Sequence, residues 1–161
     1  MTTAAWHSKE GVLAVDTQVT SANRKFRAHK VARLTDGGLI AGTGNLAHIL
    51  KVHRWVQAGM TEGGRPEFEG EGEFECLIVK GDGSVWLLDD EMEPMEVTDE
   101  FIAVGSGGPY AVAAMACGKT AAESVQIAAR FDAATSEPVE TYRLITPEPK
   151  RAPKRKAHST R

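Results

Sequence analysis

The sequence opens with Met1-Thr2-Thr3-Ala4-Ala5-Trp6, in which small and apolar residues follow two threonines and favour a buried strand. If Met1 is removed, as a small second residue permits, Thr2 carries both a hydroxyl and a free α-amine. An α-amine titrates near about 7.7–8.0, so at neutral pH it can accept the hydroxyl proton, directly or through a water. The pattern therefore makes Thr2 a candidate nucleophile that brings its own base.

The residues after this stretch predict antiparallel hairpins. Gly11–Val15 is an apolar run ending in Asp16, and the Ser8–Gly11 cluster supplies a turn back to the opening strand. Two Asp-Gly turns, at Asp36-Gly37 and Asp82-Gly83, predict further hairpins. Residues 17–28 are polar and are expected to be irregular. Strands are expected at 30–34, 39–41, 76–79, 84–88, 101–104 and 142–145.

Three helices interrupt these strands. Asn45 is a good N-cap for a helix that ends at Gly59, and a second helix is expected over 110–117. Thr120 and Glu123 form a capping-box signature at the start of a third. Residues 60–75 are rich in Gly and Glu and are expected to form a flexible loop. The order of elements predicts an α+β fold with helices outside antiparallel sheets.

Composition indicates a single soluble domain, expected over residues 1–146. The chain has 161 residues, 42% of them hydrophobic and 25% charged. Its apolar runs are too short to span a membrane, and Lys9 and Glu10 count against a secretory signal, so we expect a cytoplasmic protein. The two cysteines and five histidines show no metal-ligand spacing. We therefore expect no metal and no cofactor.

The charge is uneven along the chain. Residues 150–161 contribute +6 to a net charge of −3, so the preceding residues carry −9. With its prolines and its lack of apolar periodicity, the segment 147–161 is predicted to be a disordered basic tail. Such a tail can contact nucleic acid or an acidic partner, but a solvated tail is the simpler interpretation. We expect no nucleic-acid function.

A nucleotide-binding alternative rests on Gly42-Thr43-Gly44-Asn45-Leu46-Ala47, which fits G-x-G-x-x-A between a strand and a helix. That motif requires a parallel strand after the helix, with an acid near its end. Here a Gly- and Glu-rich segment follows instead. The small residues at this helix start can equally present backbone N–H groups to a substrate or an oxyanion.

Several segments taken together resemble the proteasome β-subunit family, and most closely its bacterial HslV-type threonine peptidases. The most specific is the run Phe101-Ile102-Ala103-Val104-Gly105-Ser106-Gly107-Gly108-Pro109-Tyr110-Ala111. The others are Thr2-Thr3, the strand ending at Asp16 with Thr20 beyond it, His29-Lys30-Val31 and Leu39-Ile40-Ala41-Gly42. The resemblance covers about residues 2–145 without the loop 60–75. It implies a four-layer αββα sandwich of the N-terminal-nucleophile hydrolase type.

The same resemblance implies roles for individual residues. Thr2 would be the nucleophile, with its amine as base. Lys30 would lower the cost of the developing alkoxide, and Asp16 would fix the position of Lys30. Five further residues have implied roles: Ser106 near the amine, the Gly42 N–H in the oxyanion hole, Asp132 as a second acid beside the amine, and Thr20 and Gly44 along the substrate backbone.

The implied activity is hydrolysis of polypeptide substrates inside a homo-oligomeric ring, with an ATPase unfoldase as a further implied partner. The chain departs from the family at residues 60–75, where relatives carry a long helix, and in its basic tail. Two alternatives stay open at this point. One is a catalytically silent proteasome-like scaffold or assembly protein, and the other is an N-terminal-nucleophile hydrolase that acts on a small amide.

Overall fold

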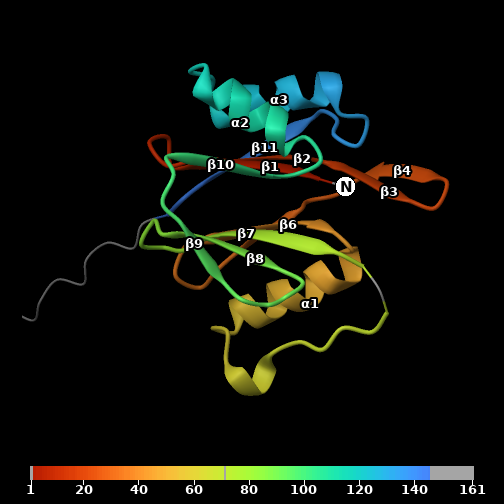
Figure 1. The fold of residues 1–161 in the computed structure, drawn as a ribbon, viewed down its shortest axis with the longest axis vertical. Helices are drawn as coiled ribbons and strands as arrows, with labels where there is room; N and C mark the ends of the chain where they lie inside the picture. The colour runs from red at the N-terminus through yellow and green to blue at the C-terminus, as the bar shows by residue number, and fades with distance from the viewer. Residues whose placement is uncertain (1, 71, 146–161) are drawn as a thin grey trace, which may run out of the picture.

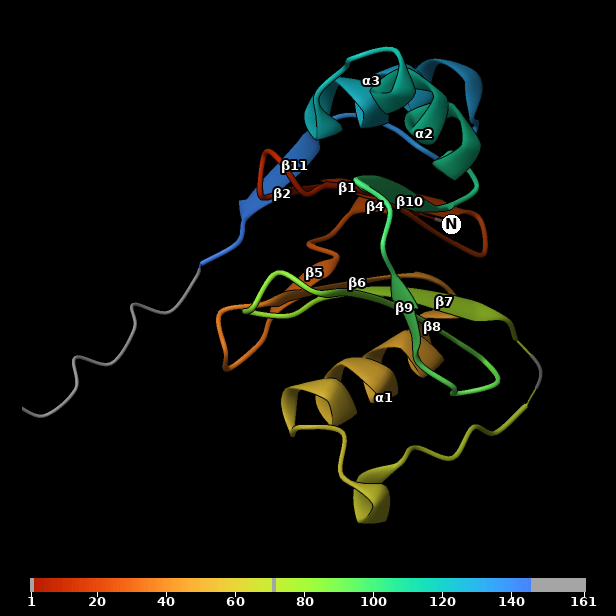
Figure 2. The same cartoon turned by 60° about the vertical axis from the view of Figure 1, so that its left-hand side comes forward.

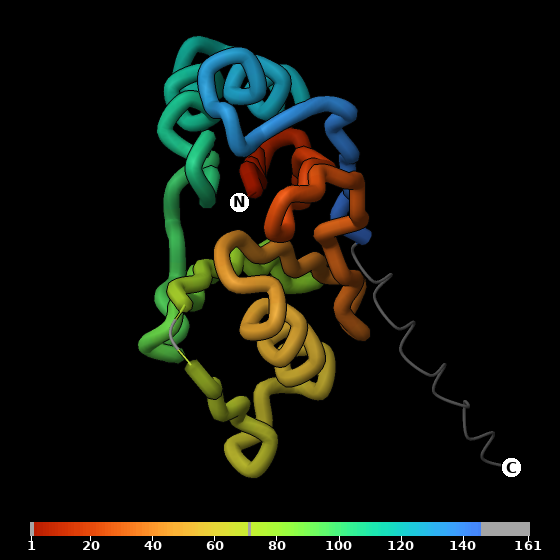
Figure 3. The backbone as a smooth tube through the Cα atoms, turned by 90° about the vertical axis from the view of Figure 1, so that its right-hand side faces the viewer, coloured from red at the N-terminus to blue at the C-terminus, as the bar shows by residue number. Residues whose placement is uncertain are grey.

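The computed structural model describes residues 2–70 and 72–145, and in this part of the chain two β-sheets lie face to face between helical layers (Figures 1 and 2). Helices α2 (Gly108–Ala116) and α3 (Ala121–Phe131) cover one sheet, and α1 (Leu46–Gln57) covers the other. Figure 3 shows α1 at the opposite end of the molecule from α2 and α3. The predicted α+β class and the αββα sandwich are confirmed.

The first sheet has four strands in the order β10-β1-β2-β11. These are β1 (Thr3–His7), β2 (Val12–Asp16), β10 (Phe101–Gly105) and β11 (Val139–Arg143). All neighbours are antiparallel, and Thr3 stands opposite Gly105 in the β1–β10 register. The expected last strand, 142–145, starts three residues earlier in the structure, because its bounds are set by pairing with the distant β2.

The second sheet has five strands in the order β5-β6-β7-β8-β9. They are β5 (Val31–Arg33), β6 (Leu39–Gly44), β7 (Phe74–Val79), β8 (Val85–Asp89) and β9 (Met95–Val97). β6 is antiparallel to both β5 and β7. The strand after α1 is therefore not parallel to the strand before it, which excludes the dinucleotide-binding unit.

The expectation of an irregular segment at 17–28 was wrong. These residues form a separate hairpin of β3 (Gln18–Ser21) and β4 (Arg24–Arg27), with Ala22 at a positive φ of 49° in the turn. The strands were missed because their side chains are polar and mostly exposed, so apolar alternation is absent. The hairpin extends beside the N-terminal end of β1 (Figure 1).

Three apolar layers hold the sandwich together, and strand alternation decides which side chain enters which layer. In β2, Leu13 and Val15 lie between the sheets, whereas Ala14 faces α2 and α3. In β6, Leu39 lies between the sheets and Ile40 packs toward α1. Small alanines on the helical side of the first sheet let α2 and α3 approach closely.

The helix signals were confirmed. Asn45 accepts hydrogen bonds from the backbone nitrogens of Ala47 and His48, and Thr120 forms a capping box with Glu123. Between α1 and β7, the segment contains a short 3₁₀ turn, Glu62–Gly64. The predicted basic tail 147–161 lies outside the described residues. In the described ranges, no helix is long and apolar enough to cross a membrane.

Candidate active site

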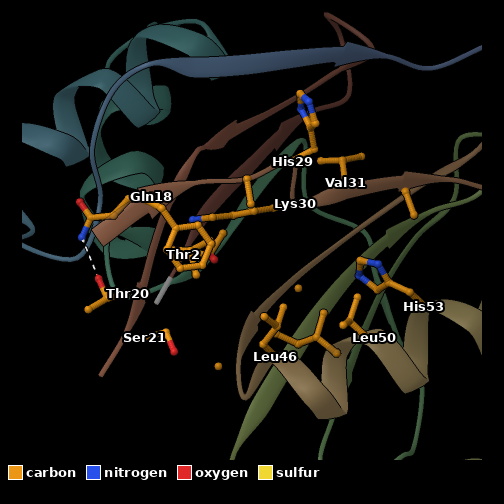
Figure 4. Close-up of a pocket in the computed structure, with 17 residues that line it drawn as sticks. Thr2, Gln18, Thr20, Ser21, His29, Lys30, Val31, Leu46, Leu50 and His53 are labelled. Carbon is orange, nitrogen blue, oxygen red and sulfur yellow. Dashed lines mark hydrogen bonds between the residues drawn. The ribbon is translucent and has the colours of Figure 1, made fainter. Parts of the chain in front are cut away.

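A pocket of about 410 Å³ opens beside Thr2, between the β3–β4 hairpin and α1. Five of the eight residues singled out in the sequence line it: Thr2, Thr20, Lys30, Gly42 and Gly44. Figure 4 shows the amino end of Lys30 beside Thr2, with Leu46 and Leu50 of α1 across the pocket. Residues far apart in the sequence therefore share one cavity.

The structure distinguishes the two opening threonines. Thr2 is 6% exposed and lines the pocket, whereas Thr3 is fully buried in β1. The Thr3 hydroxyl accepts a hydrogen bond from the Gly107 backbone nitrogen at 3.0 Å and contacts the Thr135 hydroxyl at 2.5 Å. These bonds occupy the Thr3 hydroxyl, and of the two threonines it is Thr2 that lines the pocket.

Asp16, at the end of β2, contacts two residues that line the pocket, Lys30 and Gln18. Its side chain is fully buried and accepts hydrogen bonds on both carboxylate oxygens. Oδ1 accepts from the Thr3 backbone nitrogen at 2.8 Å and from Lys30 Nζ at 2.9 Å, and Oδ2 accepts from the Gln18 nitrogen at 3.0 Å. A buried carboxylate needs such partners. Asp16 thereby joins the Thr2–Thr3 backbone to the Lys30 ammonium.

Lys30 lies just before β5, and its side chain is 8% exposed. Burial lowers the pKa of its ammonium, because desolvation disfavours the charged form, while the hydrogen bond and charge of Asp16 oppose this effect. An ammonium that is partly desolvated and held by one carboxylate is a strong local source of positive potential. Lys30 lines the same pocket as Thr2.

Ser106, which follows β10, and Asp132, which follows α3, form a hydrogen-bonded pair, and neither is among the residues that line the pocket. The Ser106 hydroxyl donates to Asp132 Oδ2 at 2.7 Å, and the Thr135 hydroxyl donates to the same oxygen. Because the Thr3 hydroxyl oxygen accepts from the Gly107 N–H, its own hydrogen can be donated to the Thr135 hydroxyl. A chain of hydrogen bonds then runs from Thr3 through Thr135 to the Asp132 carboxylate. Desolvation opposes ionisation of Asp132, but hydrogen bonds from the Thr135 and Ser106 hydroxyls and from the Ala134 backbone N–H contribute to a net lowering of its pKa.

The two candidate glycines need to be glycine for different reasons. A Cβ on Gly42 would lie 2.5 Å from Ile49 Cγ2, so the close packing of α1 on β6 requires its absence. Gly44 has a φ of +104°, where a side chain is strained, and a Cβ would meet the Glu73 carbonyl at 2.3 Å. The β5–β6 ladder stops at the Val31–Ala41 pair. The edge of β6 at Gly42 is consequently open to the pocket.

Two residues of this region were not found from the sequence. Thr43 was read only as the variable position of a G-x-G pattern, yet its hydroxyl contacts the Thr2 backbone. His53 was not singled out individually, yet it lines the pocket and its Nε2 has no hydrogen-bond partner among the described residues. Neither role has a sequence signal, because both depend on contacts between separate elements.

The chain matches no protein-family model. It is 31% identical over 120 residues to the ATP-dependent protease subunit HslV of Petrotoga mobilis, covering 64% of this chain and 68% of the relative. A Geobacillus HslV is 31% identical over 129 residues, covering 69% of this chain and 72% of the relative. The chain belongs to the HslV family. A third member, the ClpQ subunit of Bacillus licheniformis, is also 31% identical over 129 residues, covering 69% of this chain and 71% of the relative.

Solved structures confirm the HslV-type fold. Thiobacillus denitrificans BPH in complex with epoxomicin superimposes with a TM-score of 0.64 at 21% identity, covering 90% of this chain and 100% of the other. The eukaryotic HslV of Trypanosoma brucei gives a TM-score of 0.63 at 19% identity, covering 87% and 97%. At these identities the likeness concerns the fold.

Proposed function

We propose that this HslV-family chain is a threonine peptidase whose nucleophile is Thr2, exposed by removal of the preceding residue. One observation carries the assignment. Thr2 shares a pocket with an ammonium, that of Lys30, which Asp16 holds in place at 2.9 Å, whereas the hydroxyl of Thr3 is occupied by structural hydrogen bonds. Membership of a family of protease subunits supports the same activity.

The reaction follows from these groups. The Thr2 amine takes the proton of the Thr2 hydroxyl, and the oxygen attacks a peptide carbonyl to form a tetrahedral oxyanion. Lys30 stabilises the negative charge that develops on the attacking oxygen, and the Gly42 N–H is the proposed donor to the oxyanion. The proton passes to the leaving amine, which departs and leaves an ester on Thr2. Water then attacks the ester with the amine as base, which releases the acid and restores Thr2.

The walls of the pocket support a polypeptide substrate with apolar side chains. Three exposed apolar residues line it, namely Phe26 of β4 and Leu46 and Leu50 of α1. Thr20 on β3 and Gly44 at the end of β6 flank the opening, where an extended peptide can add as a strand. In this arrangement Thr20 and Gly44 bind the substrate backbone, and the apolar wall contacts the substrate side chain next to the cleaved bond.

The names of the relatives describe subunits of ATP-dependent proteases. By that relationship, the proposed assembly is a cytoplasmic homo-oligomeric ring that encloses the pockets and receives unfolded chains from an ATPase. The silent-scaffold alternative is less well supported, because Thr2, Asp16, Lys30 and Ser106 are all present. The small-amide alternative fits poorly with a pocket that is open along a strand edge.

Intact mass of the purified protein tests the proposal, before and after treatment with epoxomicin. Loss of one methionine mass and one stoichiometric adduct mapped to Thr2 is the expected result, with Thr2→Ala as the unreactive control. Thr3→Ala is the matched comparison, and any adduct that this variant forms is expected to map to Thr2. A wild-type chain with Thr2 at its N-terminus and no adduct would refute the proposal.

A further inference from the structure

The Thr43 side chain makes two contacts with the Thr2 backbone. Thr43 lies on β6 and is 6% exposed. Its hydroxyl oxygen is 3.2 Å from the Thr2 nitrogen, a peptide nitrogen that becomes the α-amine once Met1 is removed, and 3.3 Å from the Thr2 carbonyl oxygen. A threonine hydroxyl has one hydrogen and two acceptor lone pairs. It can therefore accept from the nitrogen and donate to the carbonyl at the same time.

These bonds cross from one sheet to the other. Thr2 precedes β1 in the first sheet, and Thr43 belongs to β6 in the second. On the other side of the same segment, Asp16 Oδ1 accepts from the Thr3 nitrogen at 2.8 Å. The start of the chain is thus held at Thr2 by Thr43 and at Thr3 by Asp16.

We propose that Thr43 is a positioning residue that orients the α-amine of Thr2 toward the Thr2 hydroxyl. The inference rests on the proposed function, in which that amine is the base. A free amine rotates about the N–Cα bond, and only part of this rotation places its lone pair near the hydroxyl hydrogen. When the Thr43 hydroxyl accepts one N–H of the amine, it fixes the rotation about the N–Cα bond. When the same hydroxyl donates to the Thr2 carbonyl, it fixes the main chain on the other side of the Thr2 Cα.

A purely packing role for Thr43 has a different signature. A hydroxyl that accepts from the amine stabilises the charged ammonium more than the neutral amine. Removal of the acceptor therefore shifts the acid limb of the pH–rate profile to lower pH and also slows the reaction at its plateau. Loss of packing alone lowers stability without moving that limb.

The test compares Thr43→Val, which keeps the shape and removes the hydroxyl, with Thr43→Ser, which keeps the hydroxyl. In chains whose intact mass shows Thr2 at the N-terminus, the rate of epoxomicin adduct formation is measured across pH. Thr43→Val is expected to react roughly 10- to 100-fold more slowly, as for a misplaced catalytic group, with its acid limb at lower pH. Thr43→Ser is expected to restore both values to near wild type.

Two further variants keep the result interpretable. Thr43→Ala, which also lacks the hydroxyl, replaces Thr43→Val if the latter does not fold. Thr17→Val removes another buried hydroxyl, one that donates to the Pro138 carbonyl at 3.0 Å, and should leave the acid limb in place. The inference is overturned if Thr43→Val, or Thr43→Ala in its place, reacts at the wild-type rate with an unmoved acid limb. The Thr2 adduct of the wild type would still support the proposed function in that case.

Discussion

His53 makes the stability of this protein depend on pH in a way that can be calculated. Its side chain lies on α1 with 8% exposure, and burial lowers its pKa from 6.5 to about 4 because desolvation disfavours the imidazolium. The Nε2 atom has no hydrogen-bond partner among the described residues to compensate. The folded state therefore holds His53 neutral at pH values where the unfolded chain is protonated.

The sign follows from proton binding. Between the unfolded pKa of 6.5 and the folded pKa of about 4, the unfolded state binds more protons, so acid favours unfolding. The contribution of neutral His53 is fully present above the unfolded pKa and is lost as the pH falls. At about 1.4 kcal/mol per unit of pKa shift, the complete loss is about 3 kcal/mol. Between about pH 7.5 and pH 5 it is about 2 kcal/mol.

Urea unfolding at these two pH values measures the effect, at one protein concentration because assembly also changes apparent stability. The control is His53→Leu, which removes the titrating group and leaves the other acids and bases in place. The wild type is expected to lose about 2 kcal/mol more than His53→Leu on acidification. Equal losses in the two proteins would refute the desolvation of His53.

Three other substitutions have defined outcomes. Lys30→Ala is expected to reduce peptidase turnover by roughly 100-fold or more with an unchanged circular dichroism spectrum, and retained turnover would contradict its role. Gly42→Ala is expected to lower the unfolding free energy by about 1–3 kcal/mol, because the new Cβ meets Ile49 Cγ2 at 2.5 Å; an unchanged melting temperature would count against this packing. Thr120→Ala removes the N-cap of α3, whose hydroxyl accepts from the Glu123 nitrogen, and should lower the unfolding free energy by about 0.5–2 kcal/mol without changing epoxomicin reactivity. Unchanged stability or lost reactivity would contradict this expectation.

Local patterns were sufficient for much of the fold. The Asp-Gly turns, the Asn45 cap and the apolar runs in β2 and β6 each depend on residues a few positions apart. Their physical causes, namely turn geometry, capping of free N–H groups and burial of neighbouring apolar side chains, act within one segment. The β3–β4 hairpin was missed because its polar strands contain no apolar run.

The site divides in the same way. The sequence was sufficient to name Thr2, Asp16, Lys30 and Ser106 as candidates, from residue type, order and family resemblance. Tertiary structure decided that Thr2 rather than Thr3 lines the pocket, that Asp16 joins Lys30 to the start of β1, and that Thr43 contacts Thr2. Each of these facts depends on contacts between separate elements, and Thr43 and Thr2 stand 41 residues apart on different sheets. Such contacts exist only once the two sheets have packed, so no local pattern in the sequence encodes them.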